Sequence, residues 1–221
     1  MYAQQGDDPV MSEGIRRDFD KAAANWDEKP QRRLLAAAVA AGIAQDIRLH
    51  REMQVLEYGC GTGLCGLQLA PAVGQLTAVD TSAGMLEELR KKVQSLDLGN
   101  VTPILISPDC WTLPAAAFDL VFSSMVLHHI EATQALLGHF RQSLKPGGFL
   151  ALADLEKEDG TFHDDPTGVV HYGFDPQALI AMLERLGITA LKARTVHMIN
   201  KQLGGDERTY PVFLITGQKP R

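Results

Sequence analysis

The chain has 221 residues, of which 45% are apolar and 22% charged, so it is long enough for one globular domain with its own core. Its net charge of −6, without a run of lysine or arginine, gives no sign of a nucleic acid or an anionic membrane as partner. No apolar run approaches the roughly 20 residues of a membrane span, and the N-terminal segment lacks the apolar stretch of a secretory signal. We therefore expect a cytoplasmic protein that binds neither nucleic acid nor membrane.

The chain contains three cysteines, Cys60, Cys65 and Cys110. A small, odd number without a paired framework is typical of a reducing compartment. Cys60 and Cys65 are separated by four residues, but no histidine or cysteine cluster follows that would complete a zinc site. We therefore expect no metal site and interpret both residues as small side chains packed at a tight turn.

The N-terminal segment is expected to become helical after a polar start. Residues 1–14 have little to bury, and residues 15–28 predict a short helix with Phe19 and Trp26 as apolar anchors. Pro30 suits the first turn of a second, alanine-rich helix. Together the first 50 residues are expected to form a helical cap on the rest of the chain.

Strand and helix patterns then alternate along the chain. Five short apolar runs predict strands at 53–58, 75–80, 101–107, 118–124 and 149–155. Helical patterns lie between them at 64–70, 82–96 and 131–144. This alternation is typical of right-handed βαβ units, and it predicts an α/β fold with a doubly wound, mostly parallel sheet.

The last part of the chain predicts a loop, a helix and a hairpin. A polar loop, 156–175, follows the fifth strand, and Asp175-Pro176 opens a helix that runs to about residue 186. Two extended segments, 189–199 and 209–218, are joined by Gly204-Gly205. We expect an antiparallel hairpin that brings the sheet to seven strands.

Four glycines lie in the turn after the first predicted strand, in the run VLEYGCGTGLCGLQLA from Val55 to Ala70. Glycine adopts backbone angles that other residues avoid, and it lets a ligand approach the main chain. The helix that follows offers free N–H groups and the positive end of its dipole. Asp80 closes the second strand, where a carboxylate can accept from both hydroxyls of a ribose. The turn is therefore interpreted as a nucleotide site.

The choice of nucleotide depends on the acid that precedes the glycines. The run from Gly61 to Gly66 is a G-x-G-x-x-G sequence, so a nicotinamide-dependent oxidoreductase is one hypothesis. Glu57 argues against it, because an acid beside the glycine turn repels a pyrophosphate and attracts a cationic amine.

Five motifs follow one another along the chain. The first two are Glu57-x-Gly59-x-Gly61-x-Gly63 and Asp80 at the end of the next strand. The others are Asp109-Cys110-Trp111, the run FDLVFSSMVLHHI at 118–130 and the turn LKPGGFL at 144–150. Over about residues 15–218 the chain resembles the class I S-adenosylmethionine-dependent methyltransferases. Its fourth motif is similar to that of small-molecule enzymes such as the ubiquinone and menaquinone biosynthesis group.

The resemblance implies a Rossmann-like domain at 51–221 whose last strand is antiparallel, with S-adenosylmethionine as cofactor and S-adenosylhomocysteine as product. The residues that it places at the cofactor are Trp26, Glu57, Gly59, Gly61, Gly63, Asp80, Thr81, Met85, Asp109, Cys110, Trp111 and Ser123. Glu57 would hold the methionine end, Asp80 the ribose, and Asp109 the adenine. Four of these residues have structural alternatives: Met85 as helix core, Trp26 as a helix anchor, Trp111 as loop packing and Asp80 as an acid at a helix N-terminus.

The acceptor side is less defined. A methyl group on a sulfonium is already activated, so a base is needed only when the acceptor must lose a proton. His128 and His129 follow the fourth strand and are the candidate bases, although one of them can instead hold its loop in place. The residues expected on the substrate side are His128 and Asp154 and, within the loop 156–175, His171 and Tyr172.

Two specialised acceptor classes lack their motifs in this sequence. The chain has no cysteine cluster of the kind used in arsenic methylation, and no Asn/Asp-Pro-Pro-Tyr run of the kind used on nucleic-acid bases. The resemblance therefore predicts methyl transfer to a small molecule, whose identity the sequence leaves open together with the oligomeric state. A cofactor-binding module without catalytic activity is the alternative, because a fold does not prove a reaction.

Overall fold

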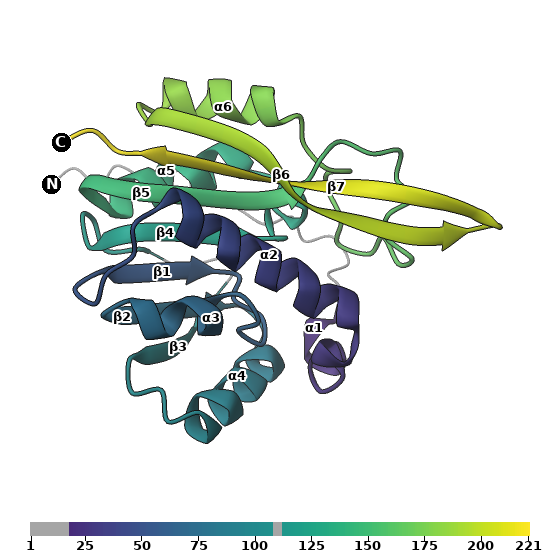
Figure 1. Cartoon of the computed structure of the whole chain (residues 1–221), viewed down its shortest axis with the longest axis horizontal. Coiled ribbons are helices and arrows are strands. Elements are labelled where there is room, and N and C mark those ends of the chain that lie inside the picture. Colours follow the sequence, from purple (N-terminus) through teal and green to yellow (C-terminus); the bar gives the residue numbers. More distant parts are fainter. Residues whose placement is uncertain (1–17, 108–111) are drawn as a thin grey trace, which may run out of the picture.

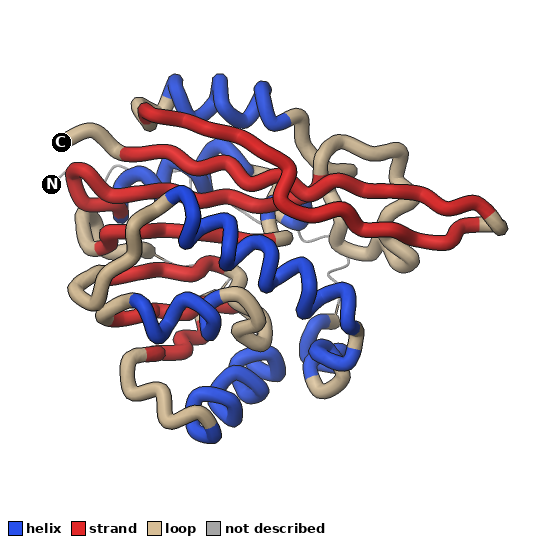
Figure 2. Tube along the Cα trace, in the orientation of Figure 1, coloured by secondary structure: helices blue, strands red, loops and turns tan. Residues whose placement is uncertain are grey.

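A computed structural model describes residues 18–107 and 112–221, and a seven-stranded sheet forms its centre (Figures 1 and 2). The strands are β1 (Gln54–Tyr58), β2 (Gln75–Asp80), β3 (Val101–Leu105), β4 (Phe118–Ser124), β5 (Leu144–Leu155), β6 (Thr189–Leu203) and β7 (Asp206–Gln218). They lie in the order β3-β2-β1-β4-β5-β7-β6. The first five strands pair in parallel, and β7 runs antiparallel to both β5 and β6. The expected fold with a reversed last strand is confirmed.

The α-helices of the described residues are α1 (Phe19–Ala23), α2 (Pro30–Asp46), α3 (Gly66–Leu69), α4 (Ala83–Ser95), α5 (Thr133–Ser143) and α6 (Pro176–Arg185). Short 3₁₀ turns occur at η1 (Trp26–Glu28), η2 (Ala70–Ala72) and η3 (Leu127–His129). The helix after the glycine turn is shorter than expected, because Pro71 has no N–H to continue the α-helical bonds. Among the described helices, none combines the length and apolar character that crossing a bilayer requires.

Helices cover both faces of the sheet (Figure 1). Successive strand residues point to opposite faces, so Val55 packs in one core cluster and Leu56 in another. The first cluster includes buried residues of α2 and α3, and the second includes buried residues of α5 and α6. Burial on both faces explains why the parallel strands read as short, continuous apolar runs.

The hairpin of β6 and β7 extends beyond the neighbouring strand (Figure 1). Pairing between β5 and β7 ends at Leu155 and Val212, whereas β6 and β7 continue to pair as far as Leu203 and Asp206. We call residues 198–211 of this hairpin the arm. The loop after β5 packs on the arm, where Thr161 Oγ1 lies 2.7 Å from the hydroxyl of Tyr210. The arm and the loop thus form a wall beside the carboxyl ends of the parallel strands.

Candidate functional site

A cavity of about 510 Å³ lies at the carboxyl ends of β1, β2 and β4. Glu57 and Tyr58 from the end of β1, Asp80 from the end of β2 and Ser124 from the end of β4 all line it. Ligands of open α/β sheets bind at this edge, beside the point where the strand order reverses. In this sheet the reversal lies between β1 and β4, because β2 and β3 are on one side of β1 and β4 is on the other.

The glycine turn after β1 forms one wall of the cavity. Gly59, Gly61 and Gly63 have φ angles of +71°, +52° and +81°, which L-residues with a side chain rarely adopt. At Gly59 there is also no room, since an added Cβ would lie 2.3 Å from Cγ2 of Val126. The prediction that these positions require glycine is confirmed, for reasons of backbone angle and close packing together.

Glu57 is buried at the base of this wall, with 3% of its surface exposed. Its Oε1 accepts from the N–H of Gly66 at 3.2 Å, and its Oε2 has no hydrogen-bond partner among the described residues. Burial raises the pKa of Glu57 to about 8, and the negative charge of Asp80 adds to the effect. Within residues 18–107 and 112–221, the site therefore holds a buried acid without a counter-ion.

Asp80 joins the end of β2 to the glycine turn. Its carboxylate accepts from the N–H of Gly61 at 2.7 Å and from the N–H of Ser82 at 2.9 Å. Burial raises the pKa of Asp80, and these two amides oppose the rise. Thr81 and Met85 line the cavity next to it, and Met85 is also part of the buried core of α4.

The N-terminal segment is fastened over this side of the cavity by two aspartates. Asp20 accepts from the hydroxyl of Ser82 at 2.5 Å and from the N–H of Gly84 at 2.8 Å. Asp27 accepts from the hydroxyl of Thr62 at 2.5 Å and forms an ion pair with Lys92. We call these contacts of Asp20 and Asp27 the clasp.

Trp26 lies between the two aspartates of the clasp and lines the cavity. The guanidinium of Arg32 stacks on its ring at 3.6 Å from the centroid, and Phe19 meets it edge to face. These two contacts hold the ring of Trp26 in place at the wall of the cavity.

His128 and Asp154 form a buried pair at the other side of the cavity. Nδ1 of His128 lies 2.7 Å from Oδ1 of Asp154, and the backbone N–H of His128 donates to the same carboxylate at 3.3 Å. Because the carboxylate accepts, Nδ1 carries a hydrogen, and in the neutral form of the ring Nε2 is the acceptor. His128 lines the cavity, whereas Asp154 does not line it and has no exposed surface.

The turn that presents His128 has an unusual backbone. Met125, directly after β4, has a φ of +59°, and its N–H donates to the carbonyl of Ala153 at 2.8 Å. Non-glycine residues in this region are uncommon and gather at functional sites. This bend leads from the end of β4 into η3, where His128 and His129 stand.

The wall around His128 is built from distant parts of the chain. His129 packs edge to face on Phe19, and His163 of the loop lies 5.0 Å from the ring of His128, measured between centroids. Lys201 of the arm holds the loop, because its ammonium donates to the carbonyl of Phe162 and to Asp164, both at 2.6 Å. Sequence patterns alone do not predict that Phe162 and Lys201 line the cavity, because only the tertiary fold brings them there.

Several expected site residues lie behind or away from this wall. Ser123 is buried and donates its hydroxyl to the carbonyl of Tyr58 at 2.8 Å, so its neighbour Ser124 lines the cavity instead. Gly63 shapes the turn without lining the cavity. The residues Asp109, Cys110 and Trp111 lie outside the part of the chain that the structure describes.

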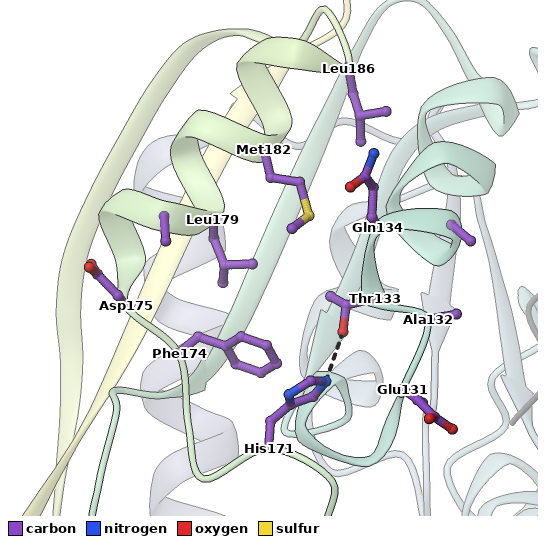
Figure 3. Close-up of a pocket in the computed structure, with 12 residues that line it drawn as sticks. Glu131, Ala132, Thr133, Gln134, His171, Phe174, Asp175, Leu179, Met182 and Leu186 are labelled. Carbon is purple, nitrogen blue, oxygen red and sulfur yellow. Dashed lines mark hydrogen bonds between the residues drawn. The ribbon is translucent and has the colours of Figure 1, made fainter. Parts of the chain in front are cut away.

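His171 and Tyr172 do not line the cavity that contains His128. Nε2 of His171 lies 3.0 Å from the carbonyl of Ile130 and 3.3 Å from the hydroxyl of Thr133, and Tyr172 is half exposed. His171 belongs to a second, apolar cavity of about 720 Å³ between the start of α5 and α6 (Figure 3). The second cavity shares no lining residue with the first.

Residues 55–148 match a family described as a methyltransferase domain. An uncharacterized methyltransferase of Schizosaccharomyces pombe is 27% identical over 173 residues, which are 72% of this chain and 60% of the relative. The malonyl-[acyl-carrier protein] O-methyltransferase of Xylella fastidiosa is 33% identical over 147 residues, which are 62% of this chain and 46% of the relative. The chain thus spans about half the length of the curated relatives that it matches.

Solved structures show the same fold. The S-adenosylmethionine-dependent methyltransferase of Aquifex aeolicus superposes with a TM-score of 0.65 at 22% identity, covering 90% of this chain and 97% of that one. The sheet order, the glycine turn with its acid and the matching family domain agree with one another. Residues 55–148 thus match a methyltransferase domain, and the chain has the fold of a solved S-adenosylmethionine-dependent methyltransferase.

Proposed function

We propose that this chain transfers a methyl group from S-adenosylmethionine to a hydroxyl group of a small molecule, with His128 as the base. The observation that carries the proposal is the pair of His128 and Asp154, whose imidazole lines the same cavity as Glu57 and Asp80. One cavity thus combines a set of residues suited to the cofactor with a group able to remove a proton.

The residues at the strand ends fit S-adenosylmethionine. The buried Oε2 of Glu57 has no hydrogen-bond partner among the described residues, and the ammonium of the methionine moiety would supply one. At Gly61 a Cβ would meet only the sulfur of Met85, at 4.0 Å, so a ligand can approach the backbone there. Asp80 would bind the ribose hydroxyls, with Thr81 and Met85 beside the adenine.

When bound, the cofactor supplies a methyl group that its sulfonium charge has already activated for in-line displacement. The chain's own residues must therefore align the acceptor, exclude water and remove a proton. Trp26 and the clasp cover the cofactor side, and Phe162 and His163 of the loop cover the acceptor side. This enclosure favours a small acceptor over a protein or a nucleic acid.

His128 is positioned to act as a general base. Its Nε2 would accept the proton of the acceptor hydroxyl, while Asp154 keeps the ring in one tautomer and stabilises the imidazolium that forms. An acceptor that loses a proton as it is methylated needs such a group, whereas a neutral amine or a thiolate does not. The pair therefore favours an alcohol or a phenol as the acceptor.

Two further features bear on the compartment in which the chain acts and on the role of its N-terminal residues. Cys60 and Cys65 are free and buried in the glycine turn, which supports a reducing compartment such as the cytoplasm. Residues 18–50 provide the clasp, Trp26 and α2, which supports their role as a cap on the site.

The test is an acceptor panel assayed for formation of S-adenosylhomocysteine by mass spectrometry. Catechols, simple phenols and aliphatic alcohols would be compared with amines, thiols and carboxylates of similar size. We expect turnover with at least one hydroxyl compound. Turnover restricted to amines or thiols would contradict the assignment of His128 as base. Tight binding of S-adenosylhomocysteine without turnover across the panel would favour the module without catalytic activity.

A further inference from the structure

Glu57 lies among groups that cannot neutralise it. Asp80 of β2 is a second acid, and the titratable groups of the glycine turn that feel the charge of Glu57 are the thiols of Cys60 and Cys65. Tyr58 is next to it on β1 and is buried as well. Asp80 is the only charged group that contributes to the pKa shift of Glu57 within the part of the chain that the structure describes.

The cations of the same cavity are either exposed to solvent or engaged with other groups. Lys29 stands at the exposed start of α2, Arg32 stacks on Trp26, and Lys201 donates to the loop. His128 is paired with Asp154, His129 lies 2.7 Å from the carbonyl of Gly168, and His163 packs on Phe162.

The carboxyl of Glu57 is also fixed in place. The N–H of Gly66 is its single donor among the described residues, and a Cβ at Gly66 would lie 2.0 Å from Oε2. The carboxyl therefore lies directly against the backbone of Gly66, where only a residue without a side chain leaves room for it. A negative charge held in this way is costly until a cation arrives.

We propose that Glu57 is neutral in the cofactor-free protein and releases its proton to solvent when the ammonium of the cofactor enters the cavity. Binding would then bring in one positive charge and expel one proton, so the buried site gains no net charge from the ammonium. The proposal rests on cofactor binding alone and is independent of the acceptor and of His128. The pKa of about 8 that burial gives Glu57 agrees with a protonated group at neutral pH.

Asp80 is the other acid that could release the proton, and its surroundings differ. Both of its carboxylate oxygens accept from backbone N–H groups, whereas Glu57 has one donor at 3.2 Å. Hydrogen bonds to the charged form keep a carboxylate ionised. We therefore assign the released proton to Glu57.

The test is calorimetric titration of the whole chain with S-adenosylhomocysteine at pH 6 and pH 7, in phosphate and in imidazole. These buffers differ in ionisation enthalpy, so the difference in heat gives the number of protons released. For an acid with a pKa near 8, we expect about 0.9 proton released at pH 7 and an affinity about tenfold higher at pH 7 than at pH 6. The wild-type chain alone can refute the proposal. It would be overturned if the heat of binding were equal in the two buffers and the affinity did not change between pH 6 and pH 7.

Variants assign the proton to one acid. At pH 7, Glu57→Gln should bind S-adenosylhomocysteine more weakly by a factor of about ten or greater. Its binding should no longer release a proton or depend on pH. Asp80→Asn should bind weakly but keep the release. Proton release that persists in Glu57→Gln would overturn the assignment to Glu57. If it also disappeared in Asp80→Asn, the proton would come from Asp80 instead. Absence of any binding would instead contradict the cofactor assignment itself, so the two failures are distinguishable.

Discussion

The cofactor side and the acceptor side of the cavity are built in different ways. On the cofactor side, Glu57, the glycine turn, Asp80 and Met85 lie within one strand–helix–strand–helix unit and are held largely by backbone N–H groups. On the acceptor side, His128, the loop and the arm come from three separate parts of the chain and are held by side-chain pairs. A local, backbone-based site can serve one ligand in many proteins, whereas a wall of distant side chains can vary with the acceptor. The two sides should therefore respond to substitution independently.

The largest effect is expected at His128. Replacing His128 with Asn should lower methyl transfer to a hydroxyl acceptor by about 10²- to 10⁴-fold, because the base is lost. The affinity for S-adenosylhomocysteine should change by less than about twofold. Turnover and calorimetric binding measured on one preparation check both statements, and His139→Asn on α5 is the matched control. A loss of cofactor affinity as large as the loss of rate would show that the two sides are not separate.

The next largest effect is expected at Asp80. Asp80→Asn should weaken S-adenosylhomocysteine binding by about 30- to 100-fold, since hydrogen bonds to a charged group contribute about 1.5–3 kcal/mol each. Asp119→Asn is the control, because Asp119 also accepts from a backbone N–H, that of Gln54 at 2.8 Å, at the start of β4 rather than at the cavity. Equal weakening in the two variants would refute a specific role for Asp80.

A smaller effect is expected at the clasp. Asp27→Ala removes the hydrogen bond from Thr62 and the ion pair with Lys92, which is partly solvent-exposed. We expect release of S-adenosylhomocysteine to become about fivefold faster, corresponding to about 1 kcal/mol. Stopped-flow tryptophan fluorescence can follow the release. Asp18→Ala is the control, because its ion pair with Lys21 stays within α1 and its cap, and an equal acceleration there would argue against the clasp.

The smallest effect is expected at Lys201, on the acceptor side. Lys201→Met keeps the apolar stem but removes the donors to Phe162 and Asp164. The KM of a hydroxyl acceptor should rise about two- to threefold, with kcat and cofactor affinity unchanged, since exposed and half-exposed pairs contribute little. Lys192→Met, on an exposed position of the same strand, is the control. A change in cofactor affinity in Lys201→Met would contradict the separation of the two sides.

The difference between the two sides also explains what the sequence could predict. The glycines of the turn and Asp80 can be predicted from the sequence, because a strand, a tight turn and a helix follow one another locally. The structure places them at one edge of the sheet. The positions of the loop residues are harder to predict from sequence. Because the loop follows β5, the sequence predicts His171 and Tyr172 on the substrate side, which the structure does not bear out. The loop instead turns back, with the N–H groups of Val170 and His171 donating to the carbonyl of His128, so its second half lies behind η3. Only long-range contacts of this kind decide which half of the loop faces the cavity.

A crystal structure of the chain with S-adenosylhomocysteine would test the central claim most directly. The account predicts the amino group of the ligand at Glu57, the ribose at Asp80 and the sulfur facing the side of the cavity that His128 lines. A ligand bound in the reverse direction, with its adenine beside His128, would contradict the assignment of both sides. Binding in the separate cavity between α5 and α6 would contradict the site itself.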